Sequence, residues 1–131
     1  MRNWNTLAEE ITNWISDYAL ENDIRSLVVG VSGGVDSAVT STLSARTGIR
    51  TIVLNMPIHQ KKQQNDLSKK HISWLKDNFN NVEERIVNLS KTYDSFVETV
   101  SANEVSDLAL ANSRARLRMT ALYATAGSNG G

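Results

Sequence analysis

Cysteine is absent from this chain of 131 residues, which excludes disulfides and thiolate metal sites. No apolar run approaches the roughly 20 residues that a membrane-spanning helix requires. Neither sign of charge is in excess, since 14 Lys and Arg balance 14 Asp and Glu, so we expect neither a nucleic-acid nor a membrane partner. The N-terminal residues carry acids where a signal peptide would need an apolar core, which predicts a cytoplasmic protein.

Proline is scarce as well, and the sequence alternates between short apolar runs and helical spacings. The ranges 26–31, 51–56 and 83–89 are typical of strands, and apolar residues recur at helical spacing before, between and after them. This alternation predicts an α/β fold in which helices cover a parallel sheet of about three strands. We expect one domain over residues 1–126, with the glycine-rich residues 127–131 as an unstructured, flexible tail.

The first predicted strand runs directly into the loop "GVSGGVDS", residues 30–37. A Walker A loop would need a lysine where Asp36 stands. A dinucleotide-binding fingerprint would need a glycine where Ser32 stands. The pattern G-x-S-x-G of a nucleophile elbow is formally present, but a triad would also need a histidine, and the chain has only His59 and His71.

Two interpretations of this loop remain. The glycine pair can simply turn the chain from strand to helix. Alternatively, backbone N–H groups and the hydroxyls of Ser32 and Ser37 can bind an anion at the helix N-terminus. Asp36 would repel a bare pyrophosphate, so in the second case a cation such as Mg²⁺ must lie between them. In the first case Asp36 only complements the helix dipole.

The last predicted helix carries three arginines in "NSRARLRM", residues 112–119. At roughly 100° per residue, Arg114 and Arg118 flank one side of the apolar stripe centred on Ala115. Asn112, Arg116 and Tyr123 flank the other side and form a patch rich in hydrogen-bond donors. Such a patch is either a solvated helix face or a site for a carboxylate or phosphate.

The motif Ser-Gly-Gly-x-Asp-Ser after a buried strand resembles the pyrophosphate loop of the N-type ATP pyrophosphatases. That superfamily includes NAD synthetases, GMP synthetases, asparagine synthetases and tRNA-thiolating enzymes. The stretches 112–119 and "NMPIHQ", residues 55–60, resemble the ammonia-dependent NAD synthetases in particular. The resemblance extends from about Trp4 to Tyr123 and implies a three-layer α/β/α, Rossmann-like fold of the adenine nucleotide alpha hydrolase type.

The resemblance implies ATP-dependent amidation of deamido-NAD to NAD through an acyl-adenylate, with release of AMP and pyrophosphate. It implies ATP and Mg²⁺ as cofactors and Asp36 as the metal ligand. The residues that it assigns to the ATP phosphates are Gly30, Val31, Ser32, Gly33, Gly34, Val35, Asp36 and Ser37. It places Leu54 and Met56 at the adenine and Arg116 at the deamido-NAD, to which we add Asn112 and Tyr123 from the helix geometry. Because there is no cysteine nucleophile to release ammonia from glutamine, free ammonia is the expected nitrogen donor.

One departure from the family pattern is large. NAD synthetases continue beyond this point with a further strand, a second metal-binding acid and lysines that contact ATP and substrate, none of which has a counterpart here. The strand 26–31 would then lie at an open edge of the sheet, so we expect a homodimer or another covering element. Two alternatives stay open: a nucleotide-binding fragment without catalysis, and another N-type ATP pyrophosphatase of the GMP synthetase or tRNA-thiolating kind.

Overall fold

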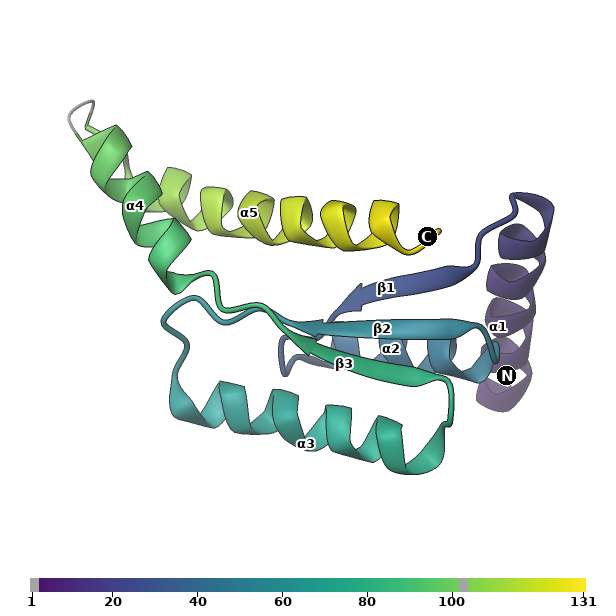
Figure 1. The fold of residues 1–131 in the computed structure, drawn as a ribbon. Coiled ribbons are helices and arrows are strands. Elements are labelled where there is room, and N and C mark those ends of the chain that lie inside the picture. Colours follow the sequence, from purple (N-terminus) through teal and green to yellow (C-terminus); the bar gives the residue numbers. More distant parts are fainter. Residues whose placement is uncertain (1–2, 102–103) are drawn as a thin grey trace.

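The computed structural model describes residues 3–101 and 104–131. Three strands alternate with helices along the chain (Figure 1). The elements are α1 (Trp4–Glu21), β1 (Ser26–Gly30), α2 (Val35–Arg46), β2 (Arg50–Asn55), α3 (Lys62–Asn78), β3 (Val82–Ile86), α4 (Ser90–Val100) and α5 (Asp107–Ser128). The first turn of α3 is polar and exposed, so apolar spacing in the sequence does not indicate where this helix begins.

The three strands form one parallel sheet in the order β1-β2-β3. Gly30 at the end of β1 pairs with Leu54 of β2, and Asn55 of β2 pairs with Ile86 of β3. The carboxyl ends of all three strands therefore lie at the same edge of the sheet. This arrangement confirms the predicted α/β fold with a parallel sheet.

Each face of the sheet packs against different helices. On one face, Val53 of β2 joins Ala45 of α2 and Leu75 of α3 in a buried cluster. On the other face, Ile52, Leu54 and Met56 pack with residues of α4 and α5. Side chains of β2 alternate between the two faces of the sheet. Because helices cover both faces, five of the six β2 residues are buried. Figure 1 shows α5 along one side of the sheet and α2 and α3 along the other.

The C-terminal residues differ from the predicted unstructured tail. Helix α5 continues through Gly127 to Ser128. Beyond it, the carbonyl oxygen of Gly130 accepts a hydrogen bond of 2.8 Å from the backbone N–H of Arg25, and the Ser26 hydroxyl donates to the carbonyl oxygen of Asn129. These bonds hold the end of the chain against the start of β1, and no local sequence pattern indicates them.

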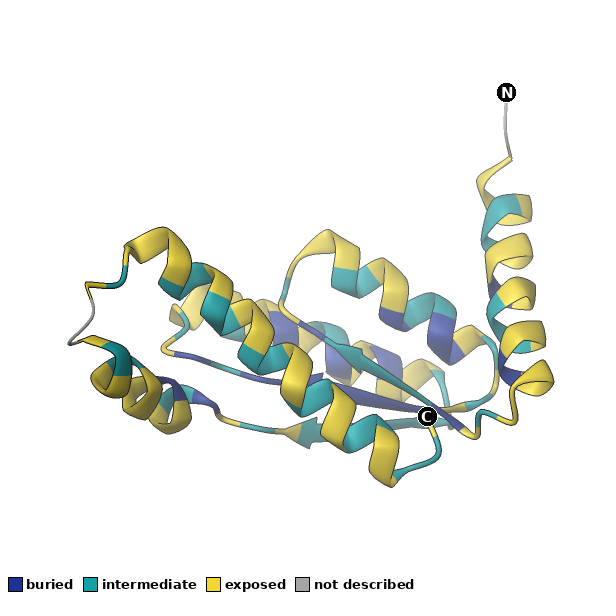
Figure 2. Ribbon diagram, turned by 90° about the horizontal axis from the view of Figure 1, so that it is seen from above, coloured by how far each residue is buried: buried dark blue, intermediate teal, exposed yellow. Residues whose placement is uncertain are grey.

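Helix α1 lies outside the two layers, at the amino-terminal end of the sheet beside α2 (Figures 1 and 2). Figure 2 shows that its outward surface is exposed along most of its length. Among the helices in the described part of the chain, none is both long and apolar enough to cross a membrane.

Candidate functional site

The loop after β1 has a backbone that only glycine fits at one position. Gly33 has a φ of +90°, and a Cβ atom there would lie 2.8 Å from the carbonyl oxygen of Gln64 in α3. Gly34 is the N-cap of α2 and makes no side-chain cap bond. The N-terminus of α2 therefore presents backbone N–H groups at the carboxyl edge of the sheet, the geometry that binds anions.

Two serine hydroxyls hold this loop together. The Ser37 hydroxyl accepts a bond of 3.1 Å from the backbone N–H of Ser32 and lies 3.2 Å from the Ser32 hydroxyl. It also donates to the carbonyl oxygen of Gly34, while the N–H of Gly34 donates to the Ser32 hydroxyl at 3.3 Å. The predicted phosphate-binding residues are thus brought together as a closed turn with two hydroxyls at the helix N-terminus.

Asp36 lies in the first turn of α2 and is exposed. Within residues 3–101 and 104–131, no three His, Asp or Glu side chains are grouped closely enough to hold a metal ion. Asp36 therefore offers one carboxylate, which fits Mg²⁺ in the sites where substrate phosphates and water supply the other oxygens. It does not form a self-contained metal cage.

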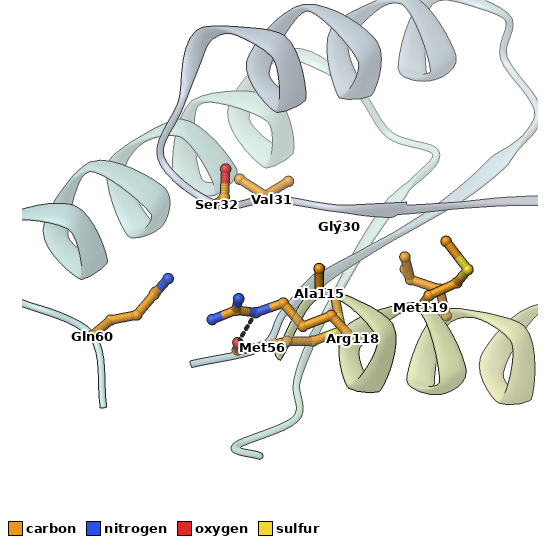
Figure 3. A pocket seen from close by; sticks show the side chains of 9 residues that line it. Gly30, Val31, Ser32, Met56, Gln60, Ala115, Arg118 and Met119 are labelled. Carbon is orange, nitrogen blue, oxygen red and sulfur yellow. Dashed lines mark hydrogen bonds between the residues drawn. The ribbon is translucent and has the colours of Figure 1, made fainter. Parts of the chain in front are cut away.

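A pocket of about 340 Å³ opens beside the loop. It lies between the end of β1, the segment after β2 and helix α5 (Figure 3). Met56 lines it, as the predicted contact with adenine requires. Leu54 does not line it and is fully buried in the core beneath α4 and α5.

Arg118 enters the same pocket from α5. Its Nε donates a hydrogen bond of 3.0 Å to the carbonyl oxygen of Met56. Burial, and next the nearby positive charge of Arg114, lower the pKa of Arg118. The sequence alone assigns no ligand to Arg118. Its angular position on the helix indicates that it is nearer the packed face than Arg116. Arg118 lies roughly 60° from the stripe centre at Ala115, whereas Arg116 lies roughly 100° away.

The donor-rich patch predicted on α5 is divided in the structure. Asn112 and Arg116 line a second pocket of about 410 Å³, which α4 completes with Thr92 and Phe96. Tyr123 instead lies in a separate groove between α5 and β1. Arg114 does not line the pocket of Asn112 and Arg116. Its guanidinium donates to the Tyr93 hydroxyl at 2.9 Å and lies over the Tyr93 ring.

The two histidines form their hydrogen bonds away from the loop of residues 30–37. The Nε2 atom of His59 lies 2.7 Å from a carboxylate oxygen of Asp94, and its backbone N–H donates to the Ser90 hydroxyl. His71 hydrogen-bonds the buried Ser41 hydroxyl, and burial lowers its pKa. In the described structure neither histidine contacts Ser32, so the nucleophile-elbow interpretation gains no support.

Known proteins resemble this chain in sequence over most of its length. The sequence profile of the NAD synthase family matches residues 7–131. The chain is 33% identical over 125 residues to the NH(3)-dependent NAD(+) synthetase of Carboxydothermus hydrogenoformans, covering 92% of this chain and 49% of that protein. It is 31% identical over 129 residues to the protein of the same name from Finegoldia magna, covering 98% and 51%. The chain therefore spans about half the length of these curated relatives.

A solved structure extends the comparison. The NMN synthetase of Francisella tularensis superposes with a TM-score of 0.88 at 27% identity, covering 99% of this chain and 52% of that one. The likeness confirms the Rossmann-like fold. It also favours this family over the GMP synthetase and tRNA-thiolating alternatives.

Proposed function

The chain belongs to the NAD synthase family, and we propose that it forms the ATP-binding half of an ammonia-dependent NAD synthetase. The observation that carries the proposal is the loop of residues 30–37 at the N-terminus of α2, beside a pocket closed by α5, in a chain matched to that family over nearly its whole length. The pocket would hold the adenosine of ATP, and the loop would hold its phosphates.

The proposed reaction has two steps. A carboxylate oxygen of deamido-NAD attacks the α-phosphorus of ATP, the bond from that phosphorus to the bridging oxygen breaks, and pyrophosphate leaves. Ammonia then attacks the acyl carbon of the adenylate, AMP leaves with the bonding electrons, and the nitrogen loses a proton to give the amide of NAD. The N–H groups and serine hydroxyls of the loop would stabilise the charge on the departing pyrophosphate.

Mg²⁺ is part of this proposal through Asp36. A bound ion would neutralise charge on the phosphates, and the Asp36 carboxylate at the first turn of α2 is placed to supply one ligand. The exposure of Asp36 leaves room for water and phosphate oxygens around the ion. Among the described residues, Asp36 is the one that we propose as a metal ligand.

The pocket between α4 and α5 is the proposed site for part of deamido-NAD. Arg116 supplies a guanidinium for a carboxylate or phosphate, and Asn112 supplies an amide beside it. Support comes from the family resemblance of the 112–119 stretch and from the shared pocket. Tyr123 lies outside this pocket, and we leave it out of the proposed substrate contacts.

Because the chain spans about half of its relatives, we propose that it binds nucleotide but shows little or no turnover alone. We also propose that it functions as a homodimer, as the resemblance implies. A binding module without catalysis is the competing possibility. Ammonia-dependent NAD formation is measured with the chain alone. Robust turnover would contradict both our proposal for the isolated chain and the binding-module alternative.

Titration calorimetry with Mg-ATP tests the nucleotide site directly. We expect binding by the unaltered chain and a loss of affinity of about tenfold or more in Asp36→Asn, since a charge-assisted contact to the phosphate-bound metal is removed. Asp77→Asn is the matched control, because Asp77 is an exposed acid at the far end of α3. Absence of Mg-ATP binding by the unaltered chain would disprove the nucleotide site.

A second substrate has specific support. The solved structure that superposes at a TM-score of 0.88 is described as an NMN synthetase, so a mononucleotide is a candidate acceptor. Thermal shift measurements in Mg-ATP with deamido-NAD or with nicotinic acid mononucleotide distinguish them. Stabilisation by the dinucleotide, reduced in Arg116→Met, is our expectation; stabilisation by the mononucleotide alone would favour the second function.

A further inference from the structure

We propose that Arg118 is a phosphate-binding residue of the nucleotide pocket, facing the loop of residues 30–37 from the opposite side. The inference rests on the proposed function and adds a ligand contact to it. It follows from where the arginine side chain lies, what holds it there and which of its hydrogen-bond donors remain without partners.

The position of the guanidinium is fixed at one nitrogen. Its Nε–H donates to the carbonyl oxygen of Met56, directly after β2, so the side chain is tied across the sheet edge rather than extended into solvent. Within the described residues, neither Nη group has a hydrogen-bond partner, and no carboxylate pairs with the charge. Figure 3 shows the guanidinium reaching from α5 into the pocket, with Ser32 and Gln60 on other walls.

An arginine in this state favours an anionic ligand. Burial and the neighbouring Arg114 both lower the pKa of Arg118, so the surroundings disfavour its charge. A partly buried cation without a counter-ion is stabilised when an anion arrives, because the anion supplies the missing charge and hydrogen-bond acceptors. The planar Nη pair matches two oxygens of one phosphate.

The remaining lining of the pocket restricts the ligand further. Met56, Met119 and Leu122 give it an apolar wall that suits a base or sugar face rather than a free ion. The loop on the other side offers the N-terminal N–H groups of α2 and the hydroxyls of Ser32 and Ser37. A nucleoside phosphate meets both conditions, with its phosphates between the loop and Arg118.

The test compares Mg-ATP with adenosine by titration calorimetry. Arg118→Met keeps an unbranched apolar stem and removes the charge and the fork. We expect it to weaken Mg-ATP binding by about tenfold or more, the loss expected for a bidentate charge-assisted pair, while adenosine affinity changes by less than about twofold. Arg118→Lys, which keeps the charge without the fork, should lose less. Arg46→Met is the matched control, because Arg46 is exposed in the last turn of α2, at the opposite end of that helix from the loop.

Each outcome decides the proposal. Equal losses for Mg-ATP and adenosine would show that Arg118 only maintains the pocket through Met56, and unchanged Mg-ATP binding would also overturn the inference. If Arg118→Met does not fold by circular dichroism, the same ligand comparison is made with Arg118→Lys. Failure of the unaltered chain to bind Mg-ATP would overturn the proposed function and this contact with it, whereas binding that is insensitive to Arg118 would overturn this contact alone.

Discussion

Gly33 is the residue whose replacement should most directly damage the nucleotide loop. Its φ of +90° strains any L side chain, and an added Cβ would lie 2.8 Å from the carbonyl oxygen of Gln64. We expect Gly33→Ala to lower the free energy of unfolding by about 1–3 kcal/mol and to abolish measurable Mg-ATP binding, because the loop must move away from α3. Urea denaturation and titration calorimetry measure the two effects.

Gly34 provides the adjacent control for that substitution. Its φ of −86° is open to any residue, and a Cβ there would meet only the Ser32 hydroxyl oxygen, at an ordinary 3.5 Å. Gly34→Ala should therefore fold with nearly unchanged stability. Equal destabilisation by the two alanines would mean that the loop backbone is not constrained as described.

At this scale the sequence predicts that residues 30–37 form a loop, and of the two residues predicted at the adenine only Met56 lines the pocket beside it. One continuous motif carries residues 30–37, so their proximity needs no tertiary knowledge. Leu54 and Met56 are two residues apart, so strand periodicity places both on one face and cannot tell them apart. The structure does, because helices α4 and α5 cover Leu54 at mid-strand whereas Met56 lies past the strand end, where the pocket opens.

Helix α5 is the element that joins the two proposed ligand pockets. Its first half packs on α4 around Asn112 and Arg116, and Arg118 in its middle reaches the end of β2. Its last turns lie against β1, with Tyr123 in that groove. A single angular projection around Ala115 assumes one neighbour along the whole helix. Such a projection groups Tyr123 with Asn112 and Arg116. In the structure Asn112 and Arg116 lie beside α4, whereas Tyr123 lies beside β1.

A charged cluster at the amino-terminal edge of the sheet connects three elements. Glu83 of β3 accepts hydrogen bonds from Arg50 of β2 at 2.8 Å and from Arg85 at 3.0 Å. Both arginines also donate to the side-chain oxygen of Asn129, the C-cap residue of α5. The hydrogen bond from Arg50, and then the one from Arg85, lower the pKa of Glu83.

The lowered pKa gives a pH dependence with a definite sign. A carboxylate that binds protons less readily when folded contributes stability above its unfolded pKa, and this contribution is lost as the pH falls through the folded value. We expect the urea concentration at the unfolding midpoint to decrease as the pH falls below about 4. In Glu83→Gln this decrease should be smaller. Glu98→Gln, an exposed acid on α4, should leave the profile as it is; an unchanged acid profile in Glu83→Gln would contradict the role given to the cluster.

On the scale of the whole molecule, the loop of residues 30–37 and the pocket beside it lie at the carboxyl edge of a sheet whose first strand has one open side. In the described part of the chain β1 pairs with β2 alone, and its other side borders the groove that includes Leu27, Leu122 and Tyr123. Tyr123 is 73% exposed there. Unpaired backbone groups beside apolar side chains are a template for association with another chain.

We therefore expect the chain to self-associate as its concentration rises, with the groove between β1 and α5 inside the contact. Tyr123→Lys places a charge in that groove and should shift sedimentation-velocity profiles toward the monomer. Leu108→Lys is the matched control, because Leu108 lies on the same helix and is also 73% exposed, but near the opposite end. A wild-type chain that stays monomeric throughout the concentration series would rule out the association. Equal effects of the two lysines would locate it elsewhere, because only Tyr123 lies beside the open strand.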